Sequence, residues 1–445
     1  MRDIGILAML LALAWLSWRK PWTGVVGLAL LGAMHPQSYG GEWAAQLPVY
    51  KVLFVVTCLA AVLEFRRLRQ WPTLPFDWRL VVLGLLFADF AISTWYAMLP
   101  DTARGRLIEV SLLLPPLLLA LILLDTREKL FAAVVATAAG VALVALKGGW
   151  WAIITGFSDR VYGPSSSQIG GNNEFAVALA MTIPLLVFWR RQITDRVLRI
   201  TLAGAIGLCY VAALTSWSRG GLLALVAMSV LLVWHSQHKV IALVLLAAGA
   251  ALALGVMSEK WQARMETIGS YQADQSFQGR LDSWKTGLAY VERDPWTGSG
   301  FDGWHALTAV EIDAENIGAR DWHSAYVEVL AEHGVPGFAL WFLLLTGTLI
   351  ELTRMVALGR RTGDPWLTDC GAMLRAAFVA YLVGGLTLGI ATWELLFQLL
   401  AYALVAKVLA KALPGSVGIF YSQTDYRAVK APMALKNQEK SNLAR

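Results

Sequence analysis

The sequence predicts an all-α polytopic membrane protein, and three observations lead to this fold class. Of its 445 residues, 57% are hydrophobic and only 15% are charged. Apolar stretches such as Leu80–Leu99 and Leu107–Leu124 recur along the chain, and about 20 mainly apolar residues suffice to cross a bilayer as a helix. The 20 tryptophans suit a protein anchored at membrane interfaces. By this rule we count roughly twelve or thirteen candidate transmembrane segments.

The first residues, MRDIGILAMLLALAWLSWRKPW, contain an apolar run that could serve as a secretion signal. They lack a net positive start and a small-residue cleavage site after the run, so we expect a retained first span. Cys58, Cys209 and Cys370 all fall within apolar runs. They predict neither a disulfide framework nor a metal site.

Arginines are concentrated in short hydrophilic connections, which the positive-inside rule places in the cytoplasm. These cytoplasmic arginines account for the net charge of +6, so the charge does not indicate a nucleic-acid partner. The other connections are expected to face outward: residues 35–47, 100–106, 148–172 and 258–336. The cytoplasmic arginines are Arg66, Arg67, Arg69, Arg190, Arg191, Arg196, Arg199, Arg354, Arg360 and Arg361.

This topology divides the chain into four parts. Residues 1–257 and 337–412 are expected to hold transmembrane helices, residues 258–336 a periplasmic loop, and residues 413–445 a cytoplasmic tail. The tail is polar and rich in lysine from Tyr421 onward, a composition that predicts disorder.

The outward loop at residues 258–336 is far longer than an ordinary connection, and its Trp, Gly and helical patterning argue for order. Four apolar side chains within Gly279–Pro295 share one face of a predicted helix. A second amphipathic helix is expected to begin near His323 and to end at Gly334, with Pro336 in the first turn of the next span. The loop is thus predicted to pack as two helices on or near the membrane surface. The four apolar residues are Leu281, Trp284, Leu288 and Val291.

Arg219 lies between two apolar helical segments. No acidic residue occurs between Asp195 and Glu259, so the sequence offers no local ion-pair partner. An arginine at membrane depth costs about 2.5 to 3.5 kcal/mol. Either it reaches the outer interface or a distant carboxylate, or it holds an anionic ligand with help from Ser216 and Ser218.

Two further arginines stand in outward segments. Arg280 is predicted in the first turn of its helix, where the helix dipole disfavours a cation. Asp282 could offset this, or the guanidinium could bind a phosphate bidentately. Arg160 lies among small and amide residues, with Asp159 beside it as an ordinary partner. Arg160, Arg219 and Arg280 are together the candidates for a diphosphate-binding set.

His323 is the candidate for proton transfer, because it stands at the start of the second predicted loop helix. It could simply be an interfacial or helix-capping histidine. Alternatively it is a general base. The partial positive charge of a helix N-terminus favours neutral imidazole, which can take a proton from a sugar hydroxyl near neutral pH.

The sequence predicts no metal site and no cofactor. His235 and His238 fall in a segment assigned to the cytoplasm, with no carboxylate near. Glu311, Asp313 and Glu315 alternate and are better explained as a solvated acidic stretch. No Asp-x-Asp motif occurs, which argues against metal-bridged diphosphate chemistry.

Taken together, these motifs resemble the O-antigen ligase and polymerase family of bacterial inner membranes. The most specific match is HSAYVEVLAEHGVPG, in which His323 and Ser324 are followed by nine residues, Gly334, two residues and Gly337. This is similar to the ligase signature of His, then Asn, Ser or Gln, nine residues, Gly, two residues, and Gly, Thr or Tyr. Supporting matches are TSWSRGG around Arg219, GRLDSW at Arg280, the DPWTGSG turn and, more loosely, RVYG with NNEFA after Arg160.

The resemblance implies a glycosyltransferase of the GT-C type with about twelve spans, a large periplasmic loop and a location in the bacterial inner membrane. Such ligases transfer a glycan from undecaprenyl diphosphate to a sugar of the lipid A core, with inversion and without a metal. Carried over by motif, Arg160, Arg219 and Arg280 would bind the diphosphate and His323 would be the base. The expected partners are the lipid-linked donor, the lipid A-core acceptor and the bilayer, and no nucleic acid.

Alternative functions stay open. An O-antigen polymerase would extend a second lipid-linked glycan, and a protein O-oligosaccharyltransferase would modify serine or threonine. From a different class, a lipid-linked glycan flippase also needs many spans and buried arginines. Transporters usually show repeated halves, and no repeat is apparent here. A membrane protein without a site would leave Arg219 unexplained.

Overall fold

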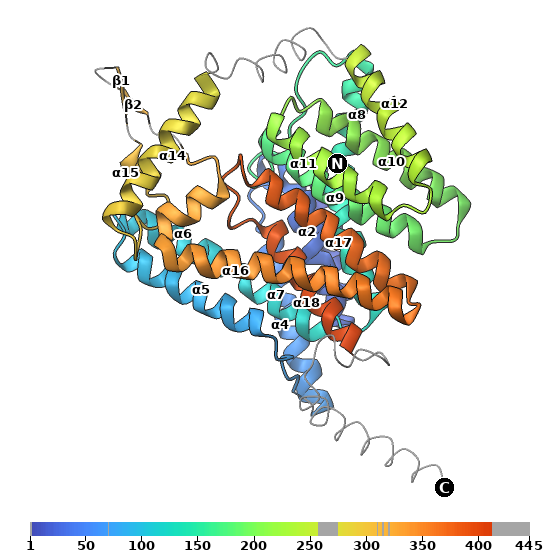
Figure 1. The fold of residues 1–445 in the computed structure, drawn as a ribbon. Helices are drawn as coiled ribbons and strands as arrows, with labels where there is room; N and C mark the ends of the chain where they lie inside the picture. The colour runs from blue at the N-terminus through green and yellow to red at the C-terminus, as the bar shows by residue number, and fades with distance from the viewer. Residues whose placement is uncertain are drawn as a thin grey trace.

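The computed structural model describes residues 2–69, 71–256, 275–308, 310–313, 316–318 and 321–411. This part of the chain is a bundle of helices (Figure 1). The predicted all-α class has one small exception in it, because β1 (Val310–Asp313) and β2 (Asn316–Gly318) form a short antiparallel pair.

The helices follow one another along the chain, mostly through short connections. The first are α1 (Arg2–Arg19), α2 (Pro21–Met34), η1 (Pro36–Tyr39), α3 (Glu42–Ala45), α4 (Val49–Leu68), α5 (Trp78–Trp95), α6 (Pro100–Ser111), α7 (Leu114–Leu123), α8 (Arg127–Ile154) and α9 (Asn172–Gln192). The others are α10 (Arg196–Leu214), α11 (Arg219–His235), α12 (Lys239–Val256), α14 (Gln275–Arg293), α15 (Trp304–Leu307), α16 (Ala325–Thr362), α17 (Pro365–Gly384) and α18 (Glu394–Lys411).

In the described part of the chain, seven helical stretches are long and apolar enough to cross a membrane, and three shorter apolar helices accompany them. The protein is therefore a multi-pass membrane protein, while the number of about twelve spans stays a prediction. The seven stretches are Trp78–Trp95, Pro100–Leu123, Arg127–Ile154, Asn172–Gln192, Arg196–Leu214, Ala325–Thr362 and Pro365–Gly384.

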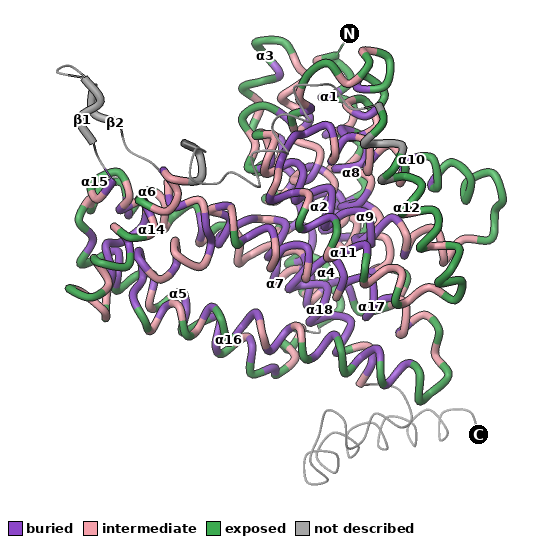
Figure 2. The backbone as a smooth tube through the Cα atoms, turned by 45° about the horizontal axis from the view of Figure 1, so that its top comes forward, coloured by how far each residue is buried: buried purple, intermediate pink, exposed green. Residues whose placement is uncertain are grey.

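The centre of the bundle is formed by α9, α17 and α18, whose buried residues are purple in Figure 2. In α9, every residue from Phe175 to Leu186 is buried. By contrast, α10 and α12 expose large apolar side chains, and Val197, Ile200 and Leu245 are 63% to 73% exposed. So much apolar surface is unusual on a water-soluble protein, and in a membrane protein it faces lipid.

Helix α16 is interrupted near its start. Its 38 residues would extend about 57 Å as one straight helix, against a hydrocarbon core of about 30 Å. Gly334 breaks the helical geometry, with φ 64° and ψ −169°. A short segment, residues 325–333, therefore precedes the part of α16 that spans. The helix that we predicted to begin near His323 begins at Ala325, two residues later.

Ion pairs mark one end of the bundle. Arg191 at the end of α9 lies 2.6 Å from Asp369 of α17, and His235 at the end of α11 lies 3.3 Å from the same carboxylate. The prediction that His235 has no carboxylate near it is wrong, because its partner lies 134 residues away in the chain. We call this end the ion-pair end. The opposite end, where α9 and α11 begin and α17 finishes, is called the site end.

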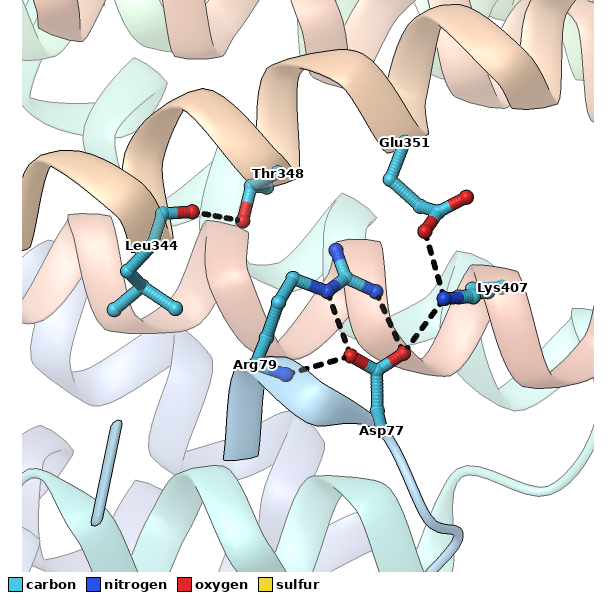
Figure 3. A network of polar contacts seen from close by, with 6 residues as sticks. All are labelled: Asp77, Arg79, Leu344, Thr348, Glu351 and Lys407. Atoms are coloured by element: carbon cyan, nitrogen blue, oxygen red, sulfur yellow. Dashed lines mark hydrogen bonds and ion pairs between the residues drawn. The ribbon is translucent and has the colours of Figure 1, made fainter. Parts of the chain in front are cut away.

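A buried network of four charged side chains joins α5, α16 and α18 (Figure 3). Lys407 Nζ lies 2.7 Å from Glu351 Oε2 and 2.9 Å from Asp77 Oδ2. Arg79 Nε lies 2.9 Å from Asp77 Oδ1, and all four side chains are at most 8% exposed. Burial alone would raise the pKa of Asp77, but hydrogen bonds from Arg79 and Lys407 outweigh it and hold that pKa well below its usual range.

Candidate functional site

Arg219 is the first residue of α11, at the site end. Ser218 caps the helix, because its side chain accepts a hydrogen bond of 3.0 Å from the Gly221 N–H. Trp217 before it has a left-handed backbone, with φ 59°, which turns the chain sharply between α10 and α11. The half-buried guanidinium of Arg219 is thus attached to a helix N-terminus, where free backbone N–H groups favour anions.

Arg160 lies beside this same turn. Its guanidinium carbon is 5.3 Å from the centre of the Trp217 ring, a cation–π distance. The Val161 N–H donates to the Thr215 carbonyl at 3.1 Å, which fixes the segment there. Asp159, the partner suggested by the sequence, accepts from the backbone N–H of Arg160. The fold thus brings Arg160 and Arg219 to one turn.

The segment of residues 385–393, between α17 and α18, connects this turn to the His323 segment. Thr387 packs so closely on Gly220 that a Cβ there would collide with its hydroxyl. On the other side, the Ala325 N–H donates to the Gly385 carbonyl at 2.8 Å. Residues about 100 apart in sequence are therefore held at the site end by one short connection.

His323 lies two residues before α16, with φ 48° and about two-fifths of its side chain exposed. Trp322 beside it is completely buried and donates from Nε1 to Glu332 Oε1 at 2.9 Å. The Asp321 Oδ2 atom lies 3.8 Å from His323 Nδ1. A buried tryptophan thus anchors the backbone on which a half-exposed imidazole and a carboxylate stand side by side.

Arg280 is the sixth residue of α14. The prediction that it lies in the first helical turn is wrong, and because the dipole effect fades within that turn, the argument from it no longer applies. One turn further along, Trp284 Nε1 donates to the Trp322 carbonyl at 2.7 Å. Arg280 is therefore carried by a helix attached to the residue that precedes His323.

The face of α14 that packs on the protein coincides only in part with the predicted one, since Trp284 contacts Trp322. Gly279, Ser283 and Gly287 are buried, whereas Leu288 is 47% exposed. A Cβ on Gly287 would lie 2.8 Å from the Trp322 ring, so the small residues make room for that ring. The hydrophobic pattern did not predict this contact with Trp322, because the contact depends on small residues rather than on apolar side chains.

Both glycines of the His323 motif occupy positions without room for a side chain. A Cβ on Gly334 would lie 2.6 Å from the Pro295 carbonyl oxygen, and its φ and ψ fall in a region that essentially only glycine adopts. A Cβ on Gly337 would lie 2.5 Å from His333 Cβ. The Ser299 and Gly300 N–H groups donate to the Ala331 and Glu332 carbonyls, both at 2.9 Å. The DPWTGSG turn and the EHGVPG turn are thus interlocked.

We expect Gly334→Ala to destabilise the protein by about 1 to 3 kcal/mol through backbone strain alone, and further through the clash with Pro295. Thermal unfolding of the purified variant in detergent measures this. Gly105→Ala in α6 is the matched control, because nothing lies within 4 Å of a Cβ built there. Equal unfolding temperatures for the two variants would contradict the strain argument.

Three charged residues near His323 were not predicted as part of the site. Asp321 and Glu328 both approach Gly389, with carboxylate oxygens 3.0 Å and 3.3 Å from a Cβ built on it. Arg106 of α6 donates to the Thr392 hydroxyl at 3.2 Å. Only the short spacing of Asp321 from His323 could have drawn attention to it in the sequence. Among the residues that the structure describes, no three His, Cys, Asp or Glu side chains are placed to hold a metal ion.

Two regions of the chain match known families. Residues 203–342 match the family described as O-antigen ligase. This region is therefore similar to the O-antigen ligase family, and the match covers less than half of the chain. Residues 1–194 match a second family, whose function is unknown, and no curated protein matches the chain. The O-antigen ligase match runs from α10 into α16 and includes Arg219, Arg280, His323 and both motif glycines, whereas Arg160 falls in the other match.

Proposed function

We propose that the protein is a GT-C type glycosyltransferase that transfers a glycan from undecaprenyl diphosphate to a hydroxyl of lipid A-core oligosaccharide. The observation that carries this proposal is the connection, through residues 385–389, of the Arg219 turn to the His323 segment. Cationic groups for a diphosphate and an imidazole for a hydroxyl are the two requirements of such a transfer. The similarity of residues 203–342 to the O-antigen ligase family supports the same chemistry.

The reaction needs one bond to form and one to break. The acceptor oxygen bonds to the anomeric carbon of the donor from the side opposite the diphosphate, so the configuration inverts. The bond to the diphosphate oxygen breaks, and undecaprenyl diphosphate leaves with the electron pair. The acceptor proton passes to His323. Arg160, Arg219 and Arg280 stabilise the charge that grows on the leaving group, without a metal or other cofactor.

The site end is assigned to the periplasmic side of the inner membrane. Arg190 and Arg191 stand at the end of α9, and Arg360 and Arg361 at the end of α16, both away from His323. The positive-inside rule favours the cytoplasm for these clusters. The donor glycan and the lipid A core would then meet at the outer face, each held by its own lipid.

For the arginines we expect weaker donor binding without loss of folding. A hydrogen bond to a charged group contributes about 1.5 to 3 kcal/mol, so Arg219→Ala and Arg280→Ala should each weaken binding roughly ten- to a hundred-fold. Binding of undecaprenyl-diphosphate-linked glycan to the purified variants measures this. Arg104→Ala is the control, because Arg104 is 64% exposed at the site end of α6. Undiminished affinity in both site variants would remove the diphosphate-binding role.

The identity of the acceptor distinguishes most directly between the candidate functions. Purified protein is incubated with the lipid-linked donor and, in separate reactions, with lipid A-core, with a second lipid-linked glycan or with a serine-containing peptide. Transfer to lipid A-core is the expected result. Transfer only to the second glycan would identify a polymerase, and transfer only to the peptide a protein O-oligosaccharyltransferase. Donor translocation without transfer would identify a flippase and overturn the proposal.

A further inference from the structure

Asp321, whose carboxylate lies beside His323, belongs to a backbone segment that is held in place by several contacts. Trp322, between Asp321 and His323, is held on both sides, because its Nε1 donates to Glu332 and its carbonyl accepts from Trp284. Asp321 also lies over Gly389, where a Cβ would come within 3.0 Å of its Oδ2 atom. Its position relative to the imidazole is therefore set by contacts from α14, α16 and the segment of residues 385–393.

The distance between the two groups is short enough for one to act on the other. Asp321 Oδ2 is 3.8 Å from His323 Nδ1, and small side-chain rotations would bring the pair to hydrogen-bonding distance. Hydrogen bonds at sites without bound substrate are often long and tighten in the complex. The atom that faces Asp321 is Nδ1, so a hydrogen bond from Nδ1–H to Asp321 would put the lone pair of the neutral ring on Nε2.

The geometry points to Asp321 as the positioning residue for His323. This inference rests on the proposed function. Asp321 accepts a hydrogen bond from Nδ1–H and so fixes the tautomer in which Nε2 carries the free lone pair. When the acceptor hydroxyl gives its proton to Nε2, the ring becomes an imidazolium, and the Asp321 carboxylate balances its charge. The proton of Nδ1 stays on Nδ1 throughout.

The other charged groups in this region are engaged elsewhere. Glu328 of α16 accepts from the Ala391 N–H at 3.2 Å, so it secures the segment of residues 385–393. Arg106 of α6 is 2.9 Å from Glu109 and also contacts Thr392. Asp302, in the turn before α15, is another acidic group facing Glu328. Asp321, by contrast, has its Oδ2 atom 3.8 Å from Nδ1 of the imidazole.

The test is the pH dependence of kcat and KM for Asp321→Asn, measured with the full-length protein, lipid-linked donor and lipid A-core. A nearby carboxylate favours the protonated ring and raises the pKa of the histidine. Its removal should shift the acidic limb of the kcat profile to lower pH by about one unit and lower kcat at least roughly ten-fold. KM for the donor should stay within about two-fold, because the arginines that bind it are untouched.

Two further variants sharpen the result. Asp321→Glu retains the charge, and should keep the acidic limb in place and recover part of kcat. If Asp321→Asn does not accumulate in the membrane, Asp321→Glu is measured in its place. A shift of the acidic limb in Asp321→Glu, which keeps the negative charge, would overturn the inference. Asp282→Asn, on the exposed side of α14, is the matched control and should behave as the unaltered protein.

The two proposals fail in different ways. An unchanged kcat and acidic limb in Asp321→Asn, together with an inactive His323→Ala variant, overturns the positioning role alone. A higher KM for the donor in Asp321→Asn, with an unchanged acidic limb of the kcat profile, also overturns the positioning role. Such a result would indicate a structural or binding role for Asp321. Full activity of His323→Ala would overturn the proposed function itself.

Discussion

His323→Ala should lower glycan transfer at least roughly a hundred-fold, because general-base catalysis by a positioned side chain contributes about 10²- to 10⁴-fold. Donor binding should persist, since the arginines are retained. Transfer from purified lipid-linked donor to lipid A-core measures the rate, and the amount of protein in the membrane shows whether folding is preserved. An unchanged rate would remove His323 from the reaction.

The backbone at His323 suggests a cleaner second variant. With φ at 48°, the residue sits in the left-handed region, which asparagine tolerates better than most residues. His323→Asn should therefore keep the local fold and lose only the basic nitrogen. His305→Ala is the matched control, because His305 is an exposed histidine of α15 stacked on Trp304. Activity lost in the control as well would point to a general effect on the loop.

Lys407→Met should destabilise the protein by about 3 to 5 kcal/mol, the usual cost of breaking a buried ion pair. The variant leaves the carboxylates of Asp77 and Glu351 without the ammonium that bridges them (Figure 3). Within the network that the structure describes, Arg79 then remains to offset two buried negative charges. A lower unfolding temperature in detergent and less protein in the membrane are the expected measurements.

Charge balance provides the decisive control for this prediction. Lys407→Met combined with Glu351→Leu removes one charge of each sign and leaves the Asp77–Arg79 pair intact. Most of the lost stability should return, since apolar replacements of whole buried pairs are often neutral. Lys129→Met, which breaks an exposed pair with Asp125, should cost at most about 1 kcal/mol. No recovery in the double variant would show that Lys407 acts through packing.

The class of the protein could be predicted from local sequence properties. Long apolar stretches revealed a helical multi-pass membrane protein, and spans such as Trp78–Trp95 and Pro365–Gly384 are found in the structure. The resemblance to the O-antigen ligase family was drawn from a motif within one short segment, from His323 to Gly337, and this segment lies inside the region that matches that family. Both kinds of signal depend on neighbours in the chain, which a sequence displays directly.

Contacts between distant segments could not be predicted in the same way. The partner of His235 is Asp369, and the segment of residues 385–393 that links Arg219 to His323 looks like part of one apolar stretch in the sequence. Arg280 was placed in the first turn because the apolar pattern used for the prediction begins at Leu281, whereas α14 already begins at Gln275. The roles of His323 and the three arginines stay predictions until the variants are measured.

The break at Gly334 gives the short helix of residues 325–333 a consequence for evolution and design. With nine residues, it extends about 13.5 Å along its own axis between the break at Gly334 and the His323 segment. Deleting one residue would shorten that separation by about 1.5 Å and rotate the His323 segment by about 100° around the helix axis. The number of residues in this short helix is therefore as important for the position of the imidazole as the contacts that hold Trp322.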